Sequence, residues 1–382
     1  MTSMPAFKIL HVITDLGMGG AEMVLYRLLS RLDRAVFASE VVSLTDDQPL
    51  GEAIRTLGIP VTALGFRPGI PDVRMVPRLA RLIRARKPQL IQTWMYHSDL
   101  AGGIAARFAG SPPVVWGIHH TVAERKALKP ATYLVARLNA LLSRRLPAKI
   151  VCCAESARLS HTRLGYFAKK MTVIPNGFDP DVFQPDASAR AAVRQELGLT
   201  SETLLVGQCA RFHPEKDHRT FLRAAQLVHH EIPEVHFLLW GKGMETGNEM
   251  LANWNREEGP GACVHFLGQR SDSNRLFAAL DLATLSSFTE AFPAVIGEAM
   301  ACAVPCVATD AGDTRIIIGD TGRIVPKRDP ESLAQAMLAM LSQPAERRIL
   351  GERARQRIIQ HYSLEKMAGE YAGLYRDIIT GG

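Results

Sequence analysis

Short apolar runs alternate with helical patterns along the whole chain, and this alternation constrains the fold more than any other feature of the sequence. Strands are expected at Lys8–Ile13 and Val114–Ile118 in the first half and at Thr203–Cys209 and Leu280–Leu285 in the second. A polar or glycine-containing turn and a stretch of helical periodicity follow each of them. A strand–helix pattern that repeats in this way predicts parallel sheets covered by helices. Because 382 residues exceed one ordinary core, two doubly wound α/β domains are expected.

The composition is that of a globular protein in a reducing compartment. Hydrophobic residues make up 47% and charged residues 22% of the chain, and no apolar run approaches the roughly 20 residues that a membrane span needs. The first residues lead directly into a strand and lack the pattern of a signal peptide. None of the six cysteines forms a C-x-x-C pair, so reduced, buried thiols are expected and metal binding by cysteine is disfavoured.

The two halves of the chain carry opposite net charge. Residues 1–175 contain 24 Lys and Arg against 11 Asp and Glu, a net +13, and the remainder contains 21 against 27, a net −6, which together give the chain's +7. A basic first half suits an anionic membrane surface or a lipid-phosphate acceptor; a solvated basic surface is the alternative. The helix expected at Val76–Arg86 leaves the same choice open, because Arg78, Arg81 and Arg84 share one of its faces. Nucleic acid is disfavoured, since the basic stretches lack interleaved aromatic residues.

The stretch Ser286–Met300 has the layout of an anion-binding turn. A buried strand precedes it, a loop of small and polar residues follows, and an apolar run at helical spacing begins after Pro293. A helix that starts directly after such a loop points free backbone N–H groups and the positive end of its dipole toward the loop. Because Pro293 has no N–H, the amides near Phe292 and Ala294 are the expected phosphate donors.

Two carboxylates flank this turn. Glu290 lies in the loop, and Glu298 lies two helical turns further along. A loop Glu can accept hydrogen bonds from sugar hydroxyls, and a helix Glu can accept them from a ribose diol. Two Glu at this spacing are also common as solvated helix charges, so the spacing alone leaves both interpretations open.

Cations and glycines stand at the ends of other expected strands. Arg211 and Lys216 lie five residues apart in the turn that follows Thr203–Cys209. Two cations at a strand–helix junction can converge on one diphosphate, and ordinary surface cations are the alternative. Gly241 lies in a second glycine-bearing turn, after the strand expected at Val235–Trp240. Ligands of parallel sheets bind at this edge.

The first half has its own candidates at the carboxyl ends of strands. Gly19 and Gly20 form a glycine-rich turn after the first strand, where the backbone can approach a phosphate closely; a tight turn with only a structural role is the alternative. The turn is not G-x-G-x-x-G, so the dinucleotide fingerprint is absent. His119 and His120 end the strand Val114–Ile118, and a His pair at this edge of a parallel sheet indicates a functional role.

These residues together resemble a known family. Glu290-x7-Glu298, followed by Ala-Met-Ala-Cys-Ala-Val-Pro-Cys-Val-Ala-Thr-Asp-Ala-Gly-Asp, is similar to the signature of retaining, nucleotide-sugar-dependent glycosyltransferases of the GT-B fold, group 1 or family 4. The block Gly-Gly-Ala-Glu at 19–22 and the string Pro-Asn-Gly-x-Asp at 175–179 also resemble loops of this family. The resemblance therefore covers nearly the whole chain.

The resemblance implies a GT-B fold, in which two doubly wound Rossmann-like domains face each other across a cleft. Residues 1–178 would form the acceptor domain and residues 179–365 the nucleotide-sugar donor domain, with Pro180–Ser188 as a linker. Residues 366–382 would form a C-terminal helix that crosses back to the first domain.

Residue roles follow from the same resemblance. Glu298 would hold the ribose, Glu290 the sugar hydroxyls, and Arg211 with Lys216 the diphosphate. His119 would point at the reacting face of the sugar, where positioning or electrostatic help is as compatible with retention as proton transfer. The remaining donor-binding candidates contribute backbone groups or edge the nucleobase: Gly19, Gly20, Gly241, Arg270, Ala291, Phe292 and Ala294. No metal and no cofactor are expected, since the two cations would neutralise the diphosphate.

The expected reaction is the transfer of a hexose or N-acetylhexosamine from a nucleoside-diphosphate sugar, with UDP as the expected nucleotide, to a hydroxyl of a glycan or lipid-linked saccharide in cell-surface polysaccharide synthesis. The expected location is the cytoplasm, with peripheral contact at the inner face of an anionic membrane. Two alternatives stay open. One is a nucleotide-sugar epimerase or phosphorylase on the same scaffold, and the other is a non-catalytic nucleotide-sugar-binding module.

Overall fold

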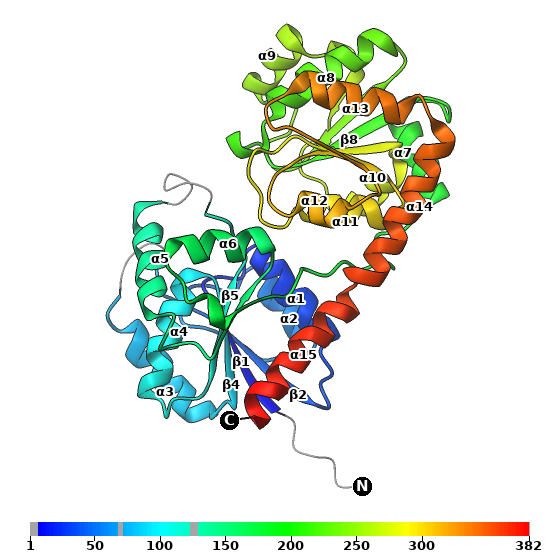
Figure 1. Cartoon of the computed structure of the whole chain (residues 1–382). Helices are drawn as coiled ribbons and strands as arrows, with labels where there is room; N and C mark the ends of the chain where they lie inside the picture. The colour runs from blue at the N-terminus through cyan, green and yellow to red at the C-terminus, as the bar shows by residue number, and fades with distance from the viewer. Residues whose placement is uncertain (1–6, 68–71, 123–128, 382) are drawn as a thin grey trace. The chain divides into compact units, whose positions relative to one another are not determined.

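A computed structural model describes residues 7–67, 72–122 and 129–381, and the chain in it divides into two compact units (Figure 1). The first unit comprises Met1–Gly177 together with Leu364–Gly382, and the second comprises Phe178–Ser363. The last helix of the chain is therefore part of the first unit. Within the described ranges, no helix combines the length and the apolar character that a membrane crossing requires.

The first unit is built on a parallel sheet with the strand order β3-β2-β1-β4-β5-β6-β7. Its strands are β1 Phe7–Ile13, β2 Phe37–Ser43, β3 Val61–Ala63, β4 Leu90–Trp94, β5 Val114–Ile118, β6 Lys149–Cys152 and β7 Met171–Val173. The central strands β4 and β5 are fully buried, as expected where helices cover both faces of a sheet. Neighbouring strands are parallel, so their carboxyl ends lie at the same edge of the sheet.

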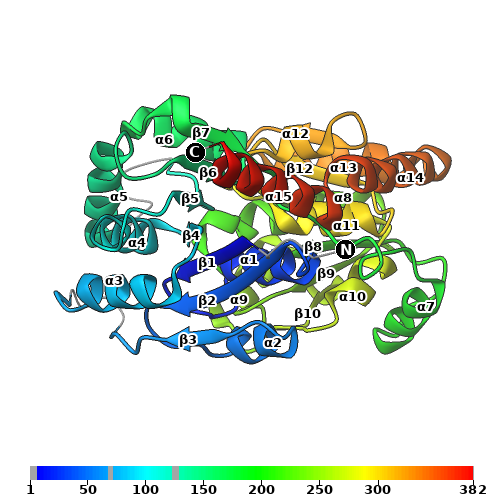
Figure 2. The ribbon, with the colours of Figure 1, turned by 90° about the horizontal axis from the view of Figure 1, so that it is seen from below.

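Helices cover both faces of this sheet. They are α1 Gly20–Arg31, α2 Leu50–Thr56, α3 Met75–Arg86, α4 Tyr96–Phe108, α5 Pro130–Leu142, α6 Glu155–Leu164 and α15 Leu364–Thr380. In both ribbon views α3, α4 and α5 lie side by side on one face, and α1, α2 and α15 lie on the other (Figures 1 and 2).

The C-terminal helix α15 packs into the core of the first unit. Leu364, Met367, Tyr371 and Tyr375 belong to the same buried cluster as the apolar side chains of β1 and α1. Tyr375 Oη donates a hydrogen bond to Gln92 Oε1 at 3.2 Å. Fully burying a side chain of this size contributes on the order of 2 kcal/mol, so the helix is an integral part of the unit.

The second unit repeats the architecture with the strand order β10-β9-β8-β11-β12-β13. Its strands are β8 Leu205–Cys209, β9 His236–Trp240, β10 Val264–Phe266, β11 Leu282–Leu285, β12 Cys306–Thr309 and β13 Arg323–Val325. Its helices are α7 Ala187–Glu196, α8 His218–Glu231, α9 Glu249–Glu258, α10 Ser273–Ala279, α11 Ala294–Ala301, α12 Thr314–Ile318, α13 Pro330–Leu341 and α14 Pro344–His361. All its strand pairs are parallel, so their carboxyl ends also share one edge.

The structure differs from the sequence-based expectations mainly at element ends. The stretch Pro180–Ser188, expected as a linker, already contains the start of α7, because Asp186 Oδ1 accepts hydrogen bonds from the backbone N–H groups of Ser188 and Ala189. A capping carboxylate of this kind satisfies donors that the first helical turn leaves unpaired.

Candidate active site

Three loops of the second unit meet at the carboxyl edge of its sheet. They follow β8, β11 and β12, which are neighbours in the strand order. The loop after β8 carries Arg211 and Lys216, the loop after β11 carries Glu290, and the loop after β12 carries Gly312. Ligands of parallel α/β sheets bind at this edge, so these loops form the candidate donor site.

Lys216 and Glu290 are in direct contact, although 74 positions separate them in the sequence. Lys216 Nζ lies 2.5 Å from Glu290 Oε1, and Ser287 Oγ donates to the same oxygen at 2.7 Å. The two side chains retain 19% and 11% of their accessible surface. A charge pair with so little solvent around it interacts more strongly than an exposed pair. The contact therefore places one positive and one negative group side by side at the edge of the sheet.

A chain of buried hydrogen bonds supports the loop that carries Lys216. His218 Nε2 lies 3.0 Å from the carbonyl oxygen of Arg211, and Gln208 Nε2 lies 3.2 Å from His218 Nδ1. Because Gln208 Nε2 can only donate, His218 Nδ1 must accept and Nε2 must carry the proton. Burial lowers the pKa of His218 to about 4, which keeps the ring neutral at pH 7. Ser286 Oγ, at 2.7 Å from the Lys216 carbonyl, ties this loop to the one after β11.

Two glycines let the loop backbones approach closely. Gly312 has φ +59°, and a Cβ there would lie 2.5 Å from the carbonyl oxygen of Glu290. Gly241 has φ +139°, and a Cβ there would lie 2.3 Å from the carbonyl oxygen of Ala210. Only glycine tolerates both the dihedral angle and the approach. The absence of a side chain at Gly312 thus lets its backbone pack directly against the backbone of Glu290.

The helix α11 begins at Ala294, directly after this loop. Pro293 is its N-cap residue, and the carbonyl oxygen of Ala291 accepts a hydrogen bond from the backbone N–H of Asp313 at 3.0 Å. The first N–H groups of a helix have no intrahelical acceptor, so the start of α11 offers donors to an anion. The ring of Phe292 is buried and stacks on Phe178 at 5.8 Å, so this residue offers its backbone and not its side chain.

Glu298 lies further along α11 and is half-buried. Burial and the nearby charge of Glu298 both raise the pKa of the Cys209 thiol. Glu298 lies on the second turn of α11, the helix that starts after the loop of Glu290.

Two other predicted cations lie near carboxylates. The Arg211 side chain is 61% exposed, and its guanidinium lies 4.0 Å from Glu215. The expected convergence of Arg211 and Lys216 on one diphosphate stays a prediction. Arg270 forms ion pairs with Glu196 at 2.7 Å and with Asp272 at 2.8 Å. Its guanidinium is held by two carboxylates, and its proposed contact with a base stays a prediction.

The first unit presents His119 at the end of β5. Both of its ring nitrogens are buried and have no hydrogen-bond partner among the residues that the structure describes, and burial lowers the pKa of the ring to about 4. The ring stacks on Trp94 at 5.1 Å, and Trp94 stacks in turn on Tyr371 of α15 at 6.2 Å. An orphaned polar group in the interior is costly unless a ligand completes its hydrogen bonds. The stack thus holds a neutral imidazole with unused hydrogen-bonding capacity.

Gly19 and Gly20 start α1 at the same edge of the first unit. Gly19 is the N-cap residue and Gly20 the first helical residue, and both are exposed. A Cβ on Gly19 would lie 2.3 Å from the carboxylate of Glu22, whereas a Cβ on Gly20 would meet nothing within 4 Å. The Glu22 carboxylate therefore covers this helix terminus, which leaves less room for an anion at Gly19.

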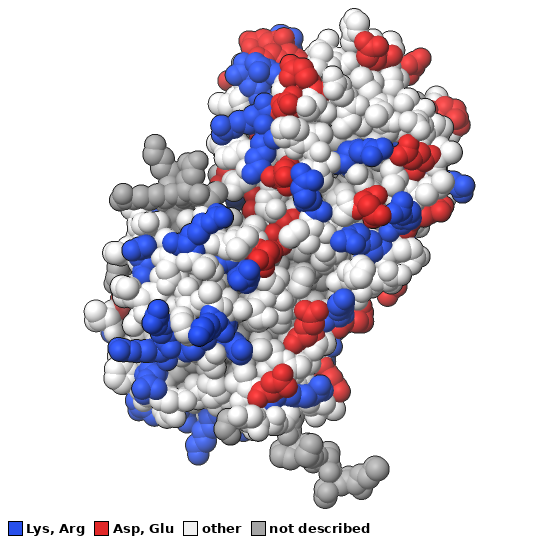
Figure 3. Space-filling model, viewed as in Figure 1, with Lys and Arg blue, Asp and Glu red and all other residues white. Residues whose placement is uncertain are grey.

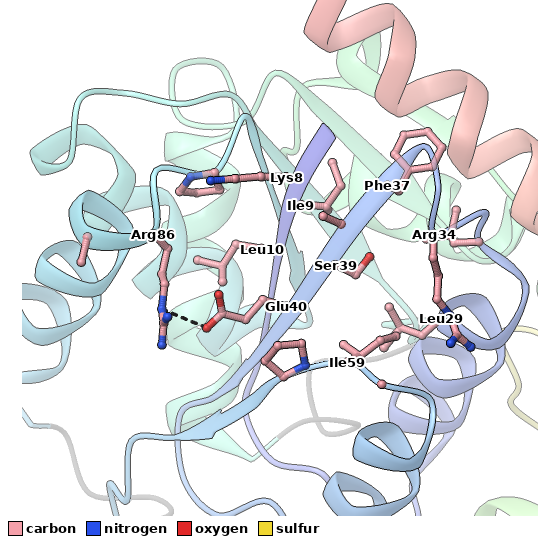
Figure 4. A pocket seen from close by; sticks show the side chains of 16 residues that line it. Lys8, Ile9, Leu10, Leu29, Arg34, Phe37, Ser39, Glu40, Ile59 and Arg86 are labelled. Atoms are coloured by element: carbon pink, nitrogen blue, oxygen red, sulfur yellow. Dashed lines mark ion pairs between the residues drawn. The ribbon is translucent and has the colours of Figure 1, made fainter. Parts of the chain in front are cut away.

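A cavity of about 540 Å³ lies at the other edge of the first unit (Figure 4). It is lined by the amino-terminal parts of β1 and β2, and Arg86 pairs with Glu40 across it at 3.2 Å. The candidate residues stand at the carboxyl ends of the strands, so this cavity is separate from them.

No group of three or more His, Cys, Asp or Glu side chains within residues 7–67, 72–122 and 129–381 is arranged to hold a metal ion. The chain contains one Asp-x-Asp, Asp179-Pro180-Asp181. Asp179 Oδ1 accepts a hydrogen bond from the backbone N–H of Asp181 at 3.1 Å, so this carboxylate shapes a turn.

Sequence reasoning did not assign roles to several residues that shape these sites. Gln208 and His218 support the Lys216 loop, and Trp94 and Tyr371 support His119. For Gln208 the sequence did hold a signal. It lies inside an apolar strand, and a buried polar side chain needs a hydrogen-bond partner.

We expect the protein to lose stability as the pH falls from about 6.5 to 4. Burial lowers the pKa of His119, His161 and His218 to about 4 and that of His11 to about 3. The folded state keeps these rings neutral, whereas the unfolded chain binds protons from about pH 6.5 downward. Each ring therefore lowers the free energy of unfolding by up to about 1.4 kcal/mol per pH unit across this window.

Urea unfolding between about pH 7.5 and 4.5 measures this slope, with His161→Gln as the comparison. A Gln side chain can still accept from the Tyr96 hydroxyl, which lies 2.8 Å from His161 Nε2. The variant should lose stability less steeply, by about one proton's contribution. Asp99, whose pKa burial raises, acts with the opposite sign but equally in both proteins. Equal slopes would contradict the prediction.

Two families of known proteins match most of the sequence of this chain. The family described as Glycosyl transferases group 1 matches residues 203–343, and the family described as Glycosyltransferase Family 4 matches residues 18–182. An Escherichia coli protein named UDP-Gal:alpha-D-GlcNAc-diphosphoundecaprenol alpha-1,3-galactosyltransferase is 24% identical over 358 residues, which cover 92% of this chain and 90% of that protein. N-acetyl-alpha-D-glucosaminyl L-malate synthase of Bacillus anthracis is 29% identical over 191 residues, or 49% of each chain.

A solved structure matches the fold over nearly its whole length. Anabaena HepE in complex with UDP superposes with a TM-score of 0.85 at 23% identity, covering 96% of this chain and 99% of that one. Two parallel α/β units matched in this way define a protein of the GT-B class, as the sequence predicted. Within that class, the chain belongs to the group 1 glycosyltransferases, family 4.

Proposed function

We propose that this glycosyltransferase moves a hexose or N-acetylhexosamine from a UDP-sugar to a hydroxyl of a glycan or lipid-linked saccharide, with retention and without a metal ion. The acceptor belongs to cell-surface polysaccharide synthesis, and the enzyme works in the cytoplasm, in peripheral contact with an anionic membrane. The observation that carries the proposal is the Lys216–Glu290 contact at the start of α11.

This contact supplies opposite charges where a sugar diphosphate needs them. The ammonium of Lys216 suits a pyrophosphate oxygen, and the carboxylate of Glu290 suits the sugar hydroxyls next to it. The N–H groups at the start of α11 add donors for the phosphates. Glu298, on the second turn of α11, suits the ribose diol.

The proposed chemistry uses these groups on the donor side. The bond between the anomeric carbon and the phosphate oxygen breaks, and its electron pair stays on the leaving pyrophosphate. Lys216 stabilises the charge that develops there. The acceptor oxygen bonds the anomeric carbon from the same face and passes its proton to the leaving phosphate oxygen. His119 donates a hydrogen bond at the reacting sugar, which completes one orphaned ring nitrogen.

Names of related proteins support the choice of nucleotide and acceptor class. The Escherichia coli relative is named for transfer from UDP-Gal to a diphosphoundecaprenol-linked sugar. Anabaena HepE has been solved with UDP and with UDP-glucose. We carry UDP and a lipid-linked saccharide over to this chain as the first candidates to test.

Thermal unfolding of the full chain with UDP-, GDP- and ADP-sugars is the first experiment. A ligand at 100 times its Kd stabilises the folded state by about 2.7 kcal/mol, so UDP-sugars should raise the Tm by several degrees and the others should not. Nucleotide release on addition of a lipid-linked saccharide, with an α-linked product by NMR, would confirm retaining transfer. Nucleotide release that does not depend on an acceptor would favour an epimerase and contradict the proposal.

A further inference from the structure

The outer face of α5 exposes three leucines in a row. Leu134, Leu138 and Leu141 retain 69%, 40% and 76% of their accessible surface. At about 100° of rotation per residue they lie within an arc of about 60° on the helix. Ala136, Asn139 and Ala140 face the other way and are buried. Single exposed apolar residues are normal, but three adjacent ones on a helix form a continuous apolar surface. We call Leu134, Leu138 and Leu141 the leucine face.

The part of the chain that carries the leucine face is strongly basic. Residues 130–173, from the start of α5 to the end of β7, contain eight Lys and Arg against one Asp or Glu, a net +7. The one acidic residue, Glu155, pairs with Arg158. Arg144 lies over the ring of Phe167, and Lys170 Nζ bonds the carbonyl oxygen of Arg144. The contacts of Arg144 and Lys170 involve an aromatic ring and a carbonyl oxygen, so they hold these two cations in place without neutralising their charge.

The basic helix α3, which the sequence also offered as a membrane-facing surface, is different. Arg86 pairs with Glu40, and Arg78 donates to the carbonyl oxygen of Leu64. Its apolar residues Leu79 and Ile83 are buried in the unit. Lys and Arg gather over the side of the first unit that carries α3, α4 and α5 (Figure 3). Only α5 combines this charge with an exposed apolar row among these three helices.

We propose that the leucine face of α5 docks the protein on an anionic bilayer surface, with Arg144 and Arg145 at the headgroups. This inference rests on the membrane contact in the proposed function and assigns it to one helix. A helix with leucines on one side and arginines beside them lies in the interfacial plane of a membrane. Anionic headgroups complement the net +7 of this region. A protein partner would need acidic groups and a groove complementary in shape to α5. An anionic bilayer needs only the exposed leucines and the positive charge beside them.

Co-sedimentation of the full chain with vesicles tests the proposal. Vesicles of equal parts phosphatidylglycerol and phosphatidylcholine should bind the protein, and vesicles of phosphatidylcholine alone should bind it far more weakly. The variant Leu134→Gln/Leu138→Gln/Leu141→Gln should bind the anionic vesicles about 100-fold more weakly. Arg144→Gln/Arg145→Gln should bind about 30-fold more weakly at low salt and less steeply with salt.

A matched control carries the same change at exposed apolar residues of the second unit. Leu227 is 42% and Ile349 50% exposed, and Leu227→Gln/Ile349→Gln should bind vesicles like the unaltered protein. Nucleotide release without vesicles should be equal in all variants, so loss of docking is distinguishable from loss of the reaction. The proposal is overturned if the unaltered protein ignores anionic vesicles or if the leucine variant binds them normally. It is also overturned if that variant converts a dimer to a monomer on size exclusion, because the face would then join two copies of the chain.

Discussion

Replacing Glu290 by Gln is expected to lower kcat/KM for sugar transfer by about 10³-fold while the protein stays folded. The carboxylate lies 2.5 Å from Lys216 Nζ and 2.7 Å from Ser287 Oγ, and only 11% of its side chain is exposed. The amide of Gln keeps the shape and one acceptor oxygen but loses the charge. In the proposed reaction it can no longer hold sugar hydroxyls as an anion does while positive charge develops on the sugar ring.

The variant Lys216→Met tests the proposed role of Lys216 at the pyrophosphate separately from the role of Glu290 at the sugar hydroxyls. Methionine has a similar reach but no charge, so the pyrophosphate loses its cation as the bond to the sugar breaks. We expect a fall in kcat of about 10² to 10³. The double variant should lose less than the sum of the two, because both side chains act on one bound donor.

An ion cluster formed by α8 and α9 of the same unit provides the control. Glu258 accepts hydrogen bonds from Arg219 and Arg223 and has no role in the proposed reaction, so Glu258→Gln should change kcat/KM less than about twofold. Steady-state rates and urea midpoints would be measured together for all variants. If Glu290→Gln turns over at the rate of the control, the donor site lies elsewhere.

The sequence predicted the positions of the loops but not how their side chains pair. Short apolar strands and glycine turns are local patterns, so the carboxyl-edge positions of Gly241, Glu290 and Lys216 could be anticipated. The convergence of Arg211 and Lys216 on a diphosphate stays a prediction, and the structure places the guanidinium of Arg211 4.0 Å from Glu215. Spacing along a loop does not determine which of two neighbouring cations is buried.

Contacts between distant elements lay beyond the sequence. Tyr371 reaches Trp94 because α15 packs on the first unit, and Arg270 meets Glu196, the last residue of α7. In both cases the partner belongs to an element whose place depends on the tertiary fold. Periodicity identifies a helix, whereas its neighbours follow from the packing of the whole unit.

Replacing Gly312 by Ala is expected to damage stability and activity together. The residue has φ +59°, which costs an L-residue about 1 kcal/mol or more. Its new Cβ would also lie 2.5 Å from the carbonyl oxygen of Glu290 and 2.6 Å from that of Ala291. Backbone atoms cannot swing aside as a side chain can, so the loop that carries Glu290 must shift. We expect the free energy of unfolding to fall by about 2 to 4 kcal/mol.

The shift of the loop should also lower kcat/KM by about 10²-fold, since a displacement of about 1 Å at a reacting group has this effect. Gly198→Ala separates the two causes, because Gly198 has φ +70° but a Cβ there meets nothing within 4 Å. That control should show the backbone strain alone, a loss of about 1 kcal/mol, with kcat/KM unchanged. Urea midpoints and initial rates at a temperature where both variants are folded measure the two effects. Equal kcat/KM for the two variants would mean that Gly312 does not position Glu290.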